Sequence, residues 1–131
     1  MRFNANNKNT KRSSFDGIEW AKSRGLEVDT WNMQLNYTKR HVHNNIVLDA
    51  GCGGGSNTNI LSNYAKEIHG MDLLDENIKL SNNKYKSDNL HFKKGNVEKI
   101  PYPDSFFDVV YSCWVVEHLE NPQFFFEEAQ F

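Results

Sequence analysis

The chain has 131 residues, a length that fits one domain with a modest hydrophobic core. Its 15 basic and 17 acidic residues give a formal net charge of −2, so the sequence shows no electrostatic footprint for duplex nucleic acid, and a nucleic-acid partner is unlikely on this ground. Two cysteines are too few for a disulfide framework, and no apolar stretch is long enough for a signal-peptide core or a membrane span, so we expect a cytoplasmic protein with no membrane contact.

The first 45 residues precede the regular part of the sequence. Residues 1–14 contain four basic and no acidic residues and few apolar ones, which predicts a flexible basic arm. The arm is either a solvated tail or a contact for an anionic substrate. Helices are expected over 15–24 and 29–41. We therefore expect 15–45 to form helical cover for an edge or face of a sheet.

From residue 46 onward, apolar runs alternate with helical patterns. Strands are predicted at 46–50, 67–72, 90–95 and 106–114, with helices at 55–65 and 74–86 and a last helix that begins at Asn121 and Pro122. Strands separated by helices indicate an α/β fold with a doubly wound parallel sheet. In such sheets, ligands bind outside the carboxyl ends of the strands.

The stretch "IVLDAGCGGGSNT", residues 46–58, joins the first predicted strand to a helix through four glycines. Such a turn brings backbone N–H groups close to a ligand. Asp72 stands 21 positions after Gly51, at the end of the second predicted strand. A carboxylate there is able to accept hydrogen bonds from two vicinal ribose hydroxyls. Together they indicate an adenosine-containing cofactor, which leaves S-adenosylmethionine and a nicotinamide dinucleotide as alternatives.

Three features favour the sulfonium cofactor. The turn reads G-x-G-x-G from Gly51, with Ser56 where the dinucleotide fingerprint has its third glycine. Asp49 directly precedes the turn, where it would repel a pyrophosphate but attract a cationic sulfonium amino acid. The later stretch "GNVEKIPYPDSFFDVVYSCWVVEHLENP" has an acid opening a strand and an aromatic-rich exit.

With these motifs in order, residues 46–129 resemble the class I S-adenosylmethionine-dependent methyltransferases, particularly the branch that acts on small molecules. The resemblance lies in "VLDAGCGGG", "GMDLLDENI", "GNVEKIPYPDSFFDVV" and "EHLENP". It implies a Rossmann-like fold, S-adenosylmethionine as cofactor, and methyl transfer to a small-molecule acceptor by in-line displacement. Several motifs in order are more specific than one glycine turn.

The resemblance also implies a set of cofactor-binding residues: Asp49, Gly51, Cys52, Gly53, Asp72, Leu73, Asn96, Val97, Ser112 and Cys113. Asp72 would take both ribose hydroxyls, and Leu73 would lie against the adenine. Asn96 stands where the family usually has Asp, and its amide oxygen is still able to accept from the adenine amino group. Ser112 and Cys113 would border the reacting methyl group.

Glu117 and His118 would face the methyl acceptor as catalytic residues. If the acceptor must lose a proton, His118 is the best-placed base, with Glu117 as its neighbour or rival. The alternative is that His118 only caps or packs a surface turn. His41 and His43 have no Cys or acid cluster at ligand spacing, so we expect no metal.

A motif that is absent after the fourth predicted strand limits the chemical class of the methyl acceptor. Family members that methylate amino groups of nucleobases usually have Asn/Asp-Pro-Pro-aromatic there, where this sequence reads "YSCW". A small-molecule, lipid-like or other non-nucleic acceptor is therefore favoured.

The family's sheet has seven strands, whereas this sequence ends after the fourth. Four strands in the order 3-2-1-4 would leave the outer edge of the fourth strand unpaired. We expect either a homodimer through that edge or the last helix, or cover by the N-terminal helices. Two other functions stay open: a non-catalytic half or partner subunit that binds S-adenosylmethionine, and an NAD-dependent oxidoreductase.

Overall fold

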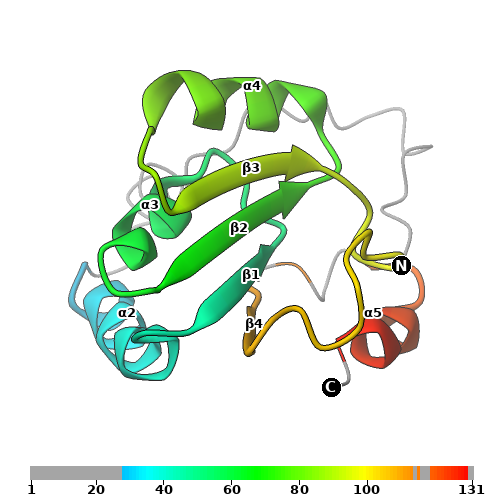
Figure 1. The fold of residues 1–131 in the computed structure, drawn as a ribbon, viewed down its shortest axis with the longest axis horizontal. Helices are drawn as coiled ribbons and strands as arrows, with labels where there is room; N and C mark the ends of the chain where they lie inside the picture. Colours follow the sequence, from blue (N-terminus) through cyan, green and yellow to red (C-terminus); the bar gives the residue numbers. More distant parts are fainter. Residues whose placement is uncertain (1–27, 114, 116–118, 130–131) are drawn as a thin grey trace.

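The computed structural model describes residues 28–113, 115 and 119–129. Within them, four strands form one parallel sheet in the order β3-β2-β1-β4 (Figure 1). The strands are β1 (Ile46–Ala50), β2 (Glu67–Asp72), β3 (Leu90–Lys94) and β4 (Val109–Tyr111). The Rossmann-like sheet and the strand order expected from the sequence are confirmed. The expected basic arm and the helix over 15–24 lie outside the described residues.

Four helices accompany the sheet: α2 (Val28–Val42), α3 (Ser56–Ser62), α4 (Asp75–Lys84) and α5 (Pro122–Glu128). Helices α3 and α4 contact β2 and β3, and α2 packs against α3. The two central helices are shorter than expected, because the backbone turns extended at Tyr85 and makes a turn after Ser62. Their positions in the chain agree with the prediction to within a turn.

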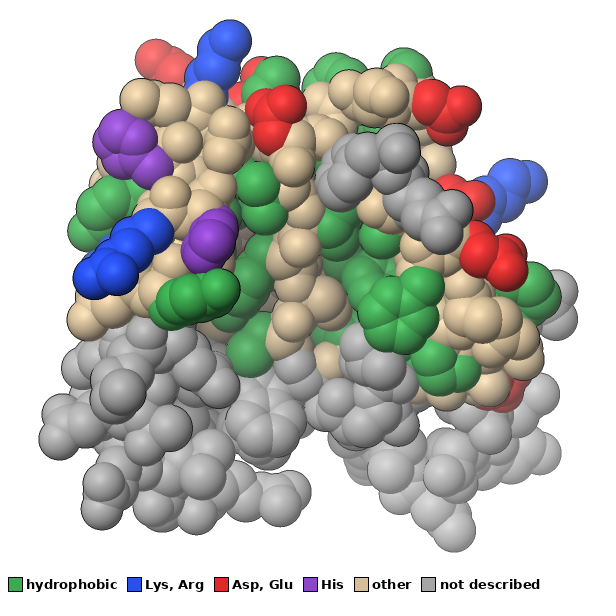
Figure 2. Space-filling model, turned by 90° about the horizontal axis from the view of Figure 1, so that it is seen from below, with side chains coloured by type: hydrophobic (Ala, Val, Ile, Leu, Met, Phe, Trp, Pro, Cys, Tyr) green, Lys and Arg blue, Asp and Glu red, His purple; other side chains and the backbone are tan. Residues whose placement is uncertain are grey.

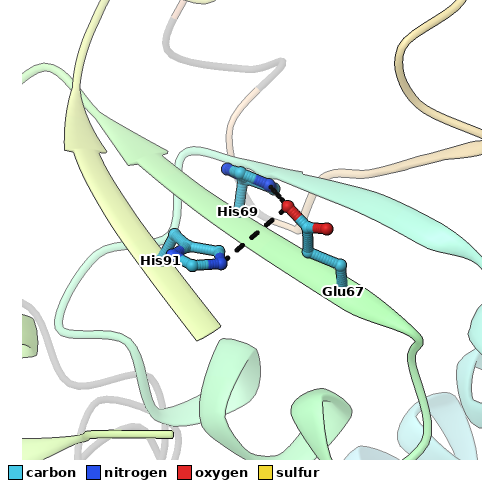
Figure 3. Close-up of side chains that lie close together, drawn as sticks. All are labelled: Glu67, His69 and His91. Carbon is cyan, nitrogen blue, oxygen red and sulfur yellow. Dashed lines mark hydrogen bonds and ion pairs between the residues drawn. The ribbon is translucent and has the colours of Figure 1, made fainter. Parts of the chain in front are cut away.

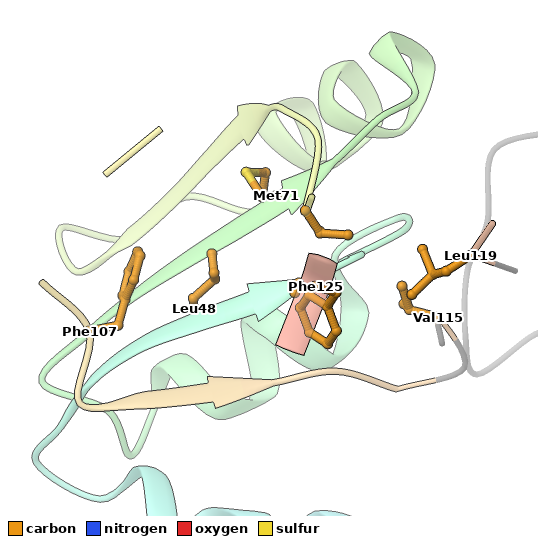
Figure 4. Packing of buried hydrophobic residues seen from close by; sticks show 8 residues of the cluster. Leu48, Met71, Phe107, Val115, Leu119 and Phe125 are labelled. Carbon is orange, nitrogen blue, oxygen red and sulfur yellow. The ribbon is translucent and has the colours of Figure 1, made fainter. Parts of the chain in front are cut away.

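Each face of the sheet contributes residues to a buried core, as is usual for parallel strands. Successive residues of a strand point to opposite faces, so Val47 joins one core and Leu48 the other. The first core, on the side of α2 and α3, contains Leu35, Val42, Val47, Leu61, Ala65, Ile68 and Leu90. The second (Figure 4) contains Leu48, Ala50, Met71, Val97, Phe107, Val115, Leu119 and Phe125, and Phe125 brings α5 to this face.

Strand β4 is much shorter than the sequence predicted. The strand expected over 106–114 covers only Val109–Tyr111. Asp108 N donates to Ile46 O at 2.8 Å, and the Asp108 carboxylate accepts from Ile46 N at 2.8 Å, so this side chain replaces one rung of the ladder. Phe107 leaves the sheet for the second core. Regular pairing therefore begins one residue later.

None of the helices in the described part of the chain is long and apolar enough to cross a lipid bilayer. The expected cytoplasmic location stays a prediction.

Candidate cofactor site

The segments that follow the four strands meet at one edge of the sheet. Parallel strands all point the same way, so their carboxyl ends lie side by side (Figure 1). Hydrogen bonds join the segments: Gly51 N and Cys52 N donate to Met71 O at 2.7 and 3.0 Å, Gly95 N to Asp72 O at 2.9 Å, and Ser112 Oγ to Ala50 O at 3.2 Å. The segments that hold the predicted cofactor-binding residues therefore lie next to one another.

The turn after β1 requires its glycines. Gly51, Gly53 and Gly55 have φ angles of 79°, 56° and 85°, in the left-handed region that favours glycine. Space is limited as well: a Cβ on Gly51 would overlap the side chain of Val115, and one on Gly55 would lie 2.8 Å from Ser81 Oγ. The backbone of this turn is thus closely approached from two sides.

We expect Gly51→Ala to destabilise the chain by about 2–5 kcal/mol. The left-handed backbone costs a non-glycine residue roughly 1–2 kcal/mol, and overpacking against Val115 adds roughly 1–3 kcal/mol. Urea unfolding measures the loss. Adding Val115→Ala should recover the packing part and leave the backbone part. A Gly51→Ala variant as stable as the wild type would show that the turn is not held in this conformation.

Asp72 ties this turn to β2. Its side chain is buried, and its Oδ2 accepts from Gly53 N at 3.0 Å. Its Oδ1 accepts from Leu74 N at 2.9 Å and from Asn77 Nδ2 at 3.2 Å. An ionised carboxylate has about four lone-pair sites, so three donors leave it capacity for a further one. Asp72, the residue predicted to bind the ribose hydroxyls, therefore lies beside the glycine turn and already holds it in place.

Asp49 is the second buried carboxylate of the site. Its Oδ2 accepts from Thr58 Oγ1 at 2.7 Å, in the first turns of α3. The pKa of Asp49 is raised to about 7, mainly by burial; the Thr58 hydrogen bond opposes the rise and the charge of Asp72 adds to it. Burial and the same two carboxylates raise the pKa of the Cys52 thiol well above its usual value. The turn therefore lies in a negative, poorly solvated environment that suits a cation.

An unused hydrogen-bond acceptor lies next to the turn. Asn57 Nδ2 donates to the Tyr111 hydroxyl at 3.5 Å, while Asn57 Oδ1 is buried and has no partner among the described residues. Burial raises the pKa of Tyr111, so its hydroxyl stays neutral. Buried acceptors are normally satisfied, so a ligand donor is an apt partner for Asn57 Oδ1.

The other predicted cofactor-binding residues differ in their exposure and in their hydrogen bonds. Leu73 is half-buried, and Ser112 and Cys113 leave β4 partly exposed. Asn96 Oδ1 accepts from Glu98 N at 2.9 Å, so its amide oxygen serves its own turn. Val97 is 1% exposed and packs in the second core.

Glu117 and His118, the predicted catalytic residues, lie outside the described residues. The two cysteines are not joined by a disulfide.

Sequence reasoning missed several polar residues that support the site. Thr58 bonds Asp49, Asn77 bonds Asp72, and Ser81 Oγ lies 3.3 Å from Gly53 O. Asn77 and Ser81 are one turn apart on α4 and are both buried. A polar pair at this spacing on the core-facing side of a helix was the available signal.

The sequence matches the family model of the methyltransferase domain over residues 48–130. The chain belongs to this methyltransferase family. S-adenosylmethionine is the family's cofactor. This methyltransferase domain is 31% identical to ajmaline N-methyltransferase of Rauvolfia serpentina over 87 residues, covering 63% of this chain and 30% of that enzyme.

It is also 27% identical to the ubiquinone biosynthesis O-methyltransferase of Rickettsia akari, covering 86% of this chain and 54% of that enzyme. Among solved structures, the YcgJ protein of Bacillus subtilis superimposes with a TM-score of 0.68 at 23% identity, covering 74% of this chain and 44% of that one, and shows the same fold. The methyltransferase domain thus spans about a third to a half of the length of these proteins.

Proposed function

We propose that this methyltransferase domain binds S-adenosylmethionine at the glycine turn and transfers the methyl group to a small-molecule acceptor. One observation carries the proposal: two buried carboxylates, Asp49 and Asp72, flank a turn of left-handed glycines at the carboxyl ends of adjacent strands. Like charges repel and opposite charges attract most strongly where water is excluded. The pair therefore favours a cofactor that carries sulfonium and ammonium charges over one that carries a pyrophosphate.

The residues at the turn fit such a cofactor. The spare acceptor capacity of Asp72 suits a ribose hydroxyl, and Leu73, half-buried directly after it, suits an apolar contact with adenine. Asn57 Oδ1 and the Asp49 carboxylate suit the ammonium group. Asn96 would contact the adenine amino group with the acceptor capacity that its own turn leaves.

Bound S-adenosylmethionine supplies an electrophilic methyl group on a positively charged sulfur, and in-line displacement leaves a neutral thioether. The chain's own contribution is orientation and exclusion of water, which can be worth many powers of ten in rate. Ser112 and Cys113 leave β4 beside Ala50 and would border the reacting centre. Glu117 and His118 are proposed to face the acceptor and, where it must lose a proton, to remove it.

The acceptor class is proposed from the relatives and the sequence together. The relatives' names describe N-methylation of ajmaline and an O-methylation in ubiquinone biosynthesis, both of which concern small molecules. The stretch after β4 lacks the Pro-Pro-aromatic motif that family members acting on nucleobase amino groups carry. Phenolic hydroxyls and amines of small apolar molecules are therefore the acceptors to test.

Calorimetric titration with S-adenosylmethionine tests cofactor choice, with NAD as the comparison ligand. We expect one molecule of S-adenosylmethionine per chain and no heat with NAD. Transfer of a labelled methyl group to panels of phenols and amines then tests the reaction. Binding without transfer to any acceptor would favour a non-catalytic half or partner subunit. A folded chain that binds NAD instead would overturn the proposal.

Self-association through the β4 edge or α5 stays a prediction. Figure 2, seen from the side where α2, β4 and α5 lie, shows hydrophobic side chains in the middle of this face. On α5, Phe124 and Phe126 are 45% and 56% exposed. We expect sedimentation equilibrium to report a dimer and the double variant Phe124→Ser, Phe126→Ser to shift it toward monomer. A monomer at every concentration would contradict the expectation.

A further inference from the structure

Three potential metal ligands lie on the face of the sheet opposite α3. Glu67 and His69 are two residues apart on β2, and His91 is the residue of β3 that pairs with His69. Residues two apart on a strand share a face, and so do paired residues of neighbouring strands. Figure 3 shows the Glu67 carboxylate next to the two imidazole rings, with dashed lines to each.

The ligand atoms of this cluster converge. Glu67 Oε1 lies 2.5 Å from His69 Nε2 and 3.8 Å from His91 Nε2. All three ligand atoms lie within 4.8 Å of one another, and the two ring centroids are 4.8 Å apart. Two neutral imidazoles and a carboxylate together carry a charge of −1, which attracts a divalent cation.

His69 is held in place by contacts on the side of its ring away from Glu67. His69 Nδ1 lies 3.0 Å from the Tyr102 hydroxyl, and edge-on contacts with the rings of Phe106 and Phe107 hold its plane. Metal-binding histidines usually engage their second ring nitrogen in such a bond, which orients the first toward the metal. The side chains of Glu67 and His91 are 34% and 49% exposed, so the cluster is open to ions from solvent.

We propose that Glu67, His69 and His91 bind a zinc ion. Zinc takes imidazole and carboxylate ligands at about 2.0–2.2 Å in a tetrahedron, which places ligand atoms roughly 3.3 Å apart. The Glu67 and His69 atoms would need to separate by less than about 1 Å, and Glu67 and His91 to approach by about half that. The two imidazole nitrogens, which lie within 4.8 Å of each other, would need to approach by up to about 1.5 Å. Water would complete the tetrahedron on the exposed side. Two nitrogen ligands make magnesium or calcium a poorer match.

The site is separate from the proposed cofactor site. Glu67 is the first residue of β2 and Asp72 the last, so the two are about 16 Å apart along the strand. Their side chains also point to opposite faces. A zinc ion here would join β3, an edge strand of the described sheet, to β2, and would fix the segment that carries Tyr102. The ion would act independently of the proposed methyl transfer.

Titration of the chelator-treated chain with zinc chloride tests the site. We expect one ion per chain, with affinity lowered at least tenfold in Glu67→Gln and in His91→Gln. These two residues are the more exposed members of the cluster, so both variants should fold. His43→Gln, which removes an exposed histidine elsewhere, is the matched control and should bind as the wild type does.

Two further readouts separate this site from adventitious binding. At a hundredfold excess over its dissociation constant, zinc should raise the melting temperature by roughly 10 °C in the wild type, and not in His91→Gln. Cobalt in place of zinc should give the visible absorption of a tetrahedral ion. Unchanged affinity in both cluster variants, or no zinc binding by the folded wild type, would overturn the proposal; in that case Glu67, His69 and Tyr102 form a hydrogen-bonded chain only. Unchanged S-adenosylmethionine binding in the variants would confirm independence.

Discussion

Replacing Asp72 with asparagine is expected to weaken S-adenosylmethionine binding by roughly 10- to 100-fold. Hydrogen bonds to a charged group are worth about 1.5–3 kcal/mol, and each 1.4 kcal/mol is a factor of ten in affinity. The amide keeps the size of the side chain but removes the charge and turns one acceptor into a donor. That donor would face Gly53 N–H, Leu74 N–H or Asn77 Nδ2, which all donate already. Part of the loss would therefore come from a displaced turn.

The matched control is Asp75→Asn, three residues away. Asp75 is exposed and, among the described residues, pairs with Lys79 at 3.2 Å across one turn of α4, so the variant makes the same charge change without touching the glycine turn. Calorimetry should find its affinity within about twofold of the wild type, since exposed ion pairs are worth little. Equal losses of S-adenosylmethionine affinity in the two variants would mean that binding depends on the negative charge in this region and not on the hydrogen bonds of Asp72. No loss in Asp72→Asn would refute its role as ribose ligand.

Asp49→Asn is expected to raise stability at alkaline pH. The folded pKa of Asp49, about 7, lies above the ordinary value of 3.8, so folding favours the protonated side chain. The stability that this provides is complete below 3.8 and is lost as the pH rises through 7. Because each pH unit between the two values costs about 1.4 kcal/mol, the wild type should lose roughly 2–3 kcal/mol between pH 5 and pH 8. The neutral amide should remove this part of the loss.

Chemical unfolding at pH 5, 6, 7 and 8 measures the difference between wild type and variant. Other groups titrate in this range as well, so the quantity to follow is the gap between the two proteins, which should widen as the pH rises. The same variant should bind S-adenosylmethionine less tightly at pH 8, because the carboxylate that destabilises the free chain is proposed to attract the ammonium. A gap that is constant with pH would show that Asp49 ionises normally.

The order of the strands and the location of Asp49 and Asp72 at the site could be predicted from the sequence. Both depend only on where strands, turns and acids stand along the chain. Asp49 is the second-last residue of β1 and Asp72 the last of β2, and the carboxyl ends of parallel strands meet whatever the details of packing. The hydrogen bonds of Thr58 to Asp49 and of Asn77 to Asp72 depend on the rotation of α3 and α4 about their axes relative to the sheet. No single residue in the sequence determines that rotation. The short β4 depends on Asp108 and Phe107, whose interactions reach residues far away in the sequence.

The Glu67, His69 and His91 cluster shows the same limit. The alternation Glu-x-His in a strand predicts that Glu67 and His69 share a face. His91 joins them only through the register of β2 and β3, which pairs it with His69. A shift of one residue would have turned His91 to the opposite face.

The double hydrogen bond between Asp108 and Ile46 bears on the order in which the chain assembles. It joins residues 62 apart in the sequence, whereas β1 with β2 and β2 with β3 pair over shorter separations. Closing a longer loop costs more chain entropy, and non-local pairing slows folding. The three-stranded part is therefore expected to form first and β4 to dock onto it last. A substitution of Asp108 that weakens its hydrogen bonds to Ile46 should chiefly speed unfolding and leave the folding rate nearly unchanged.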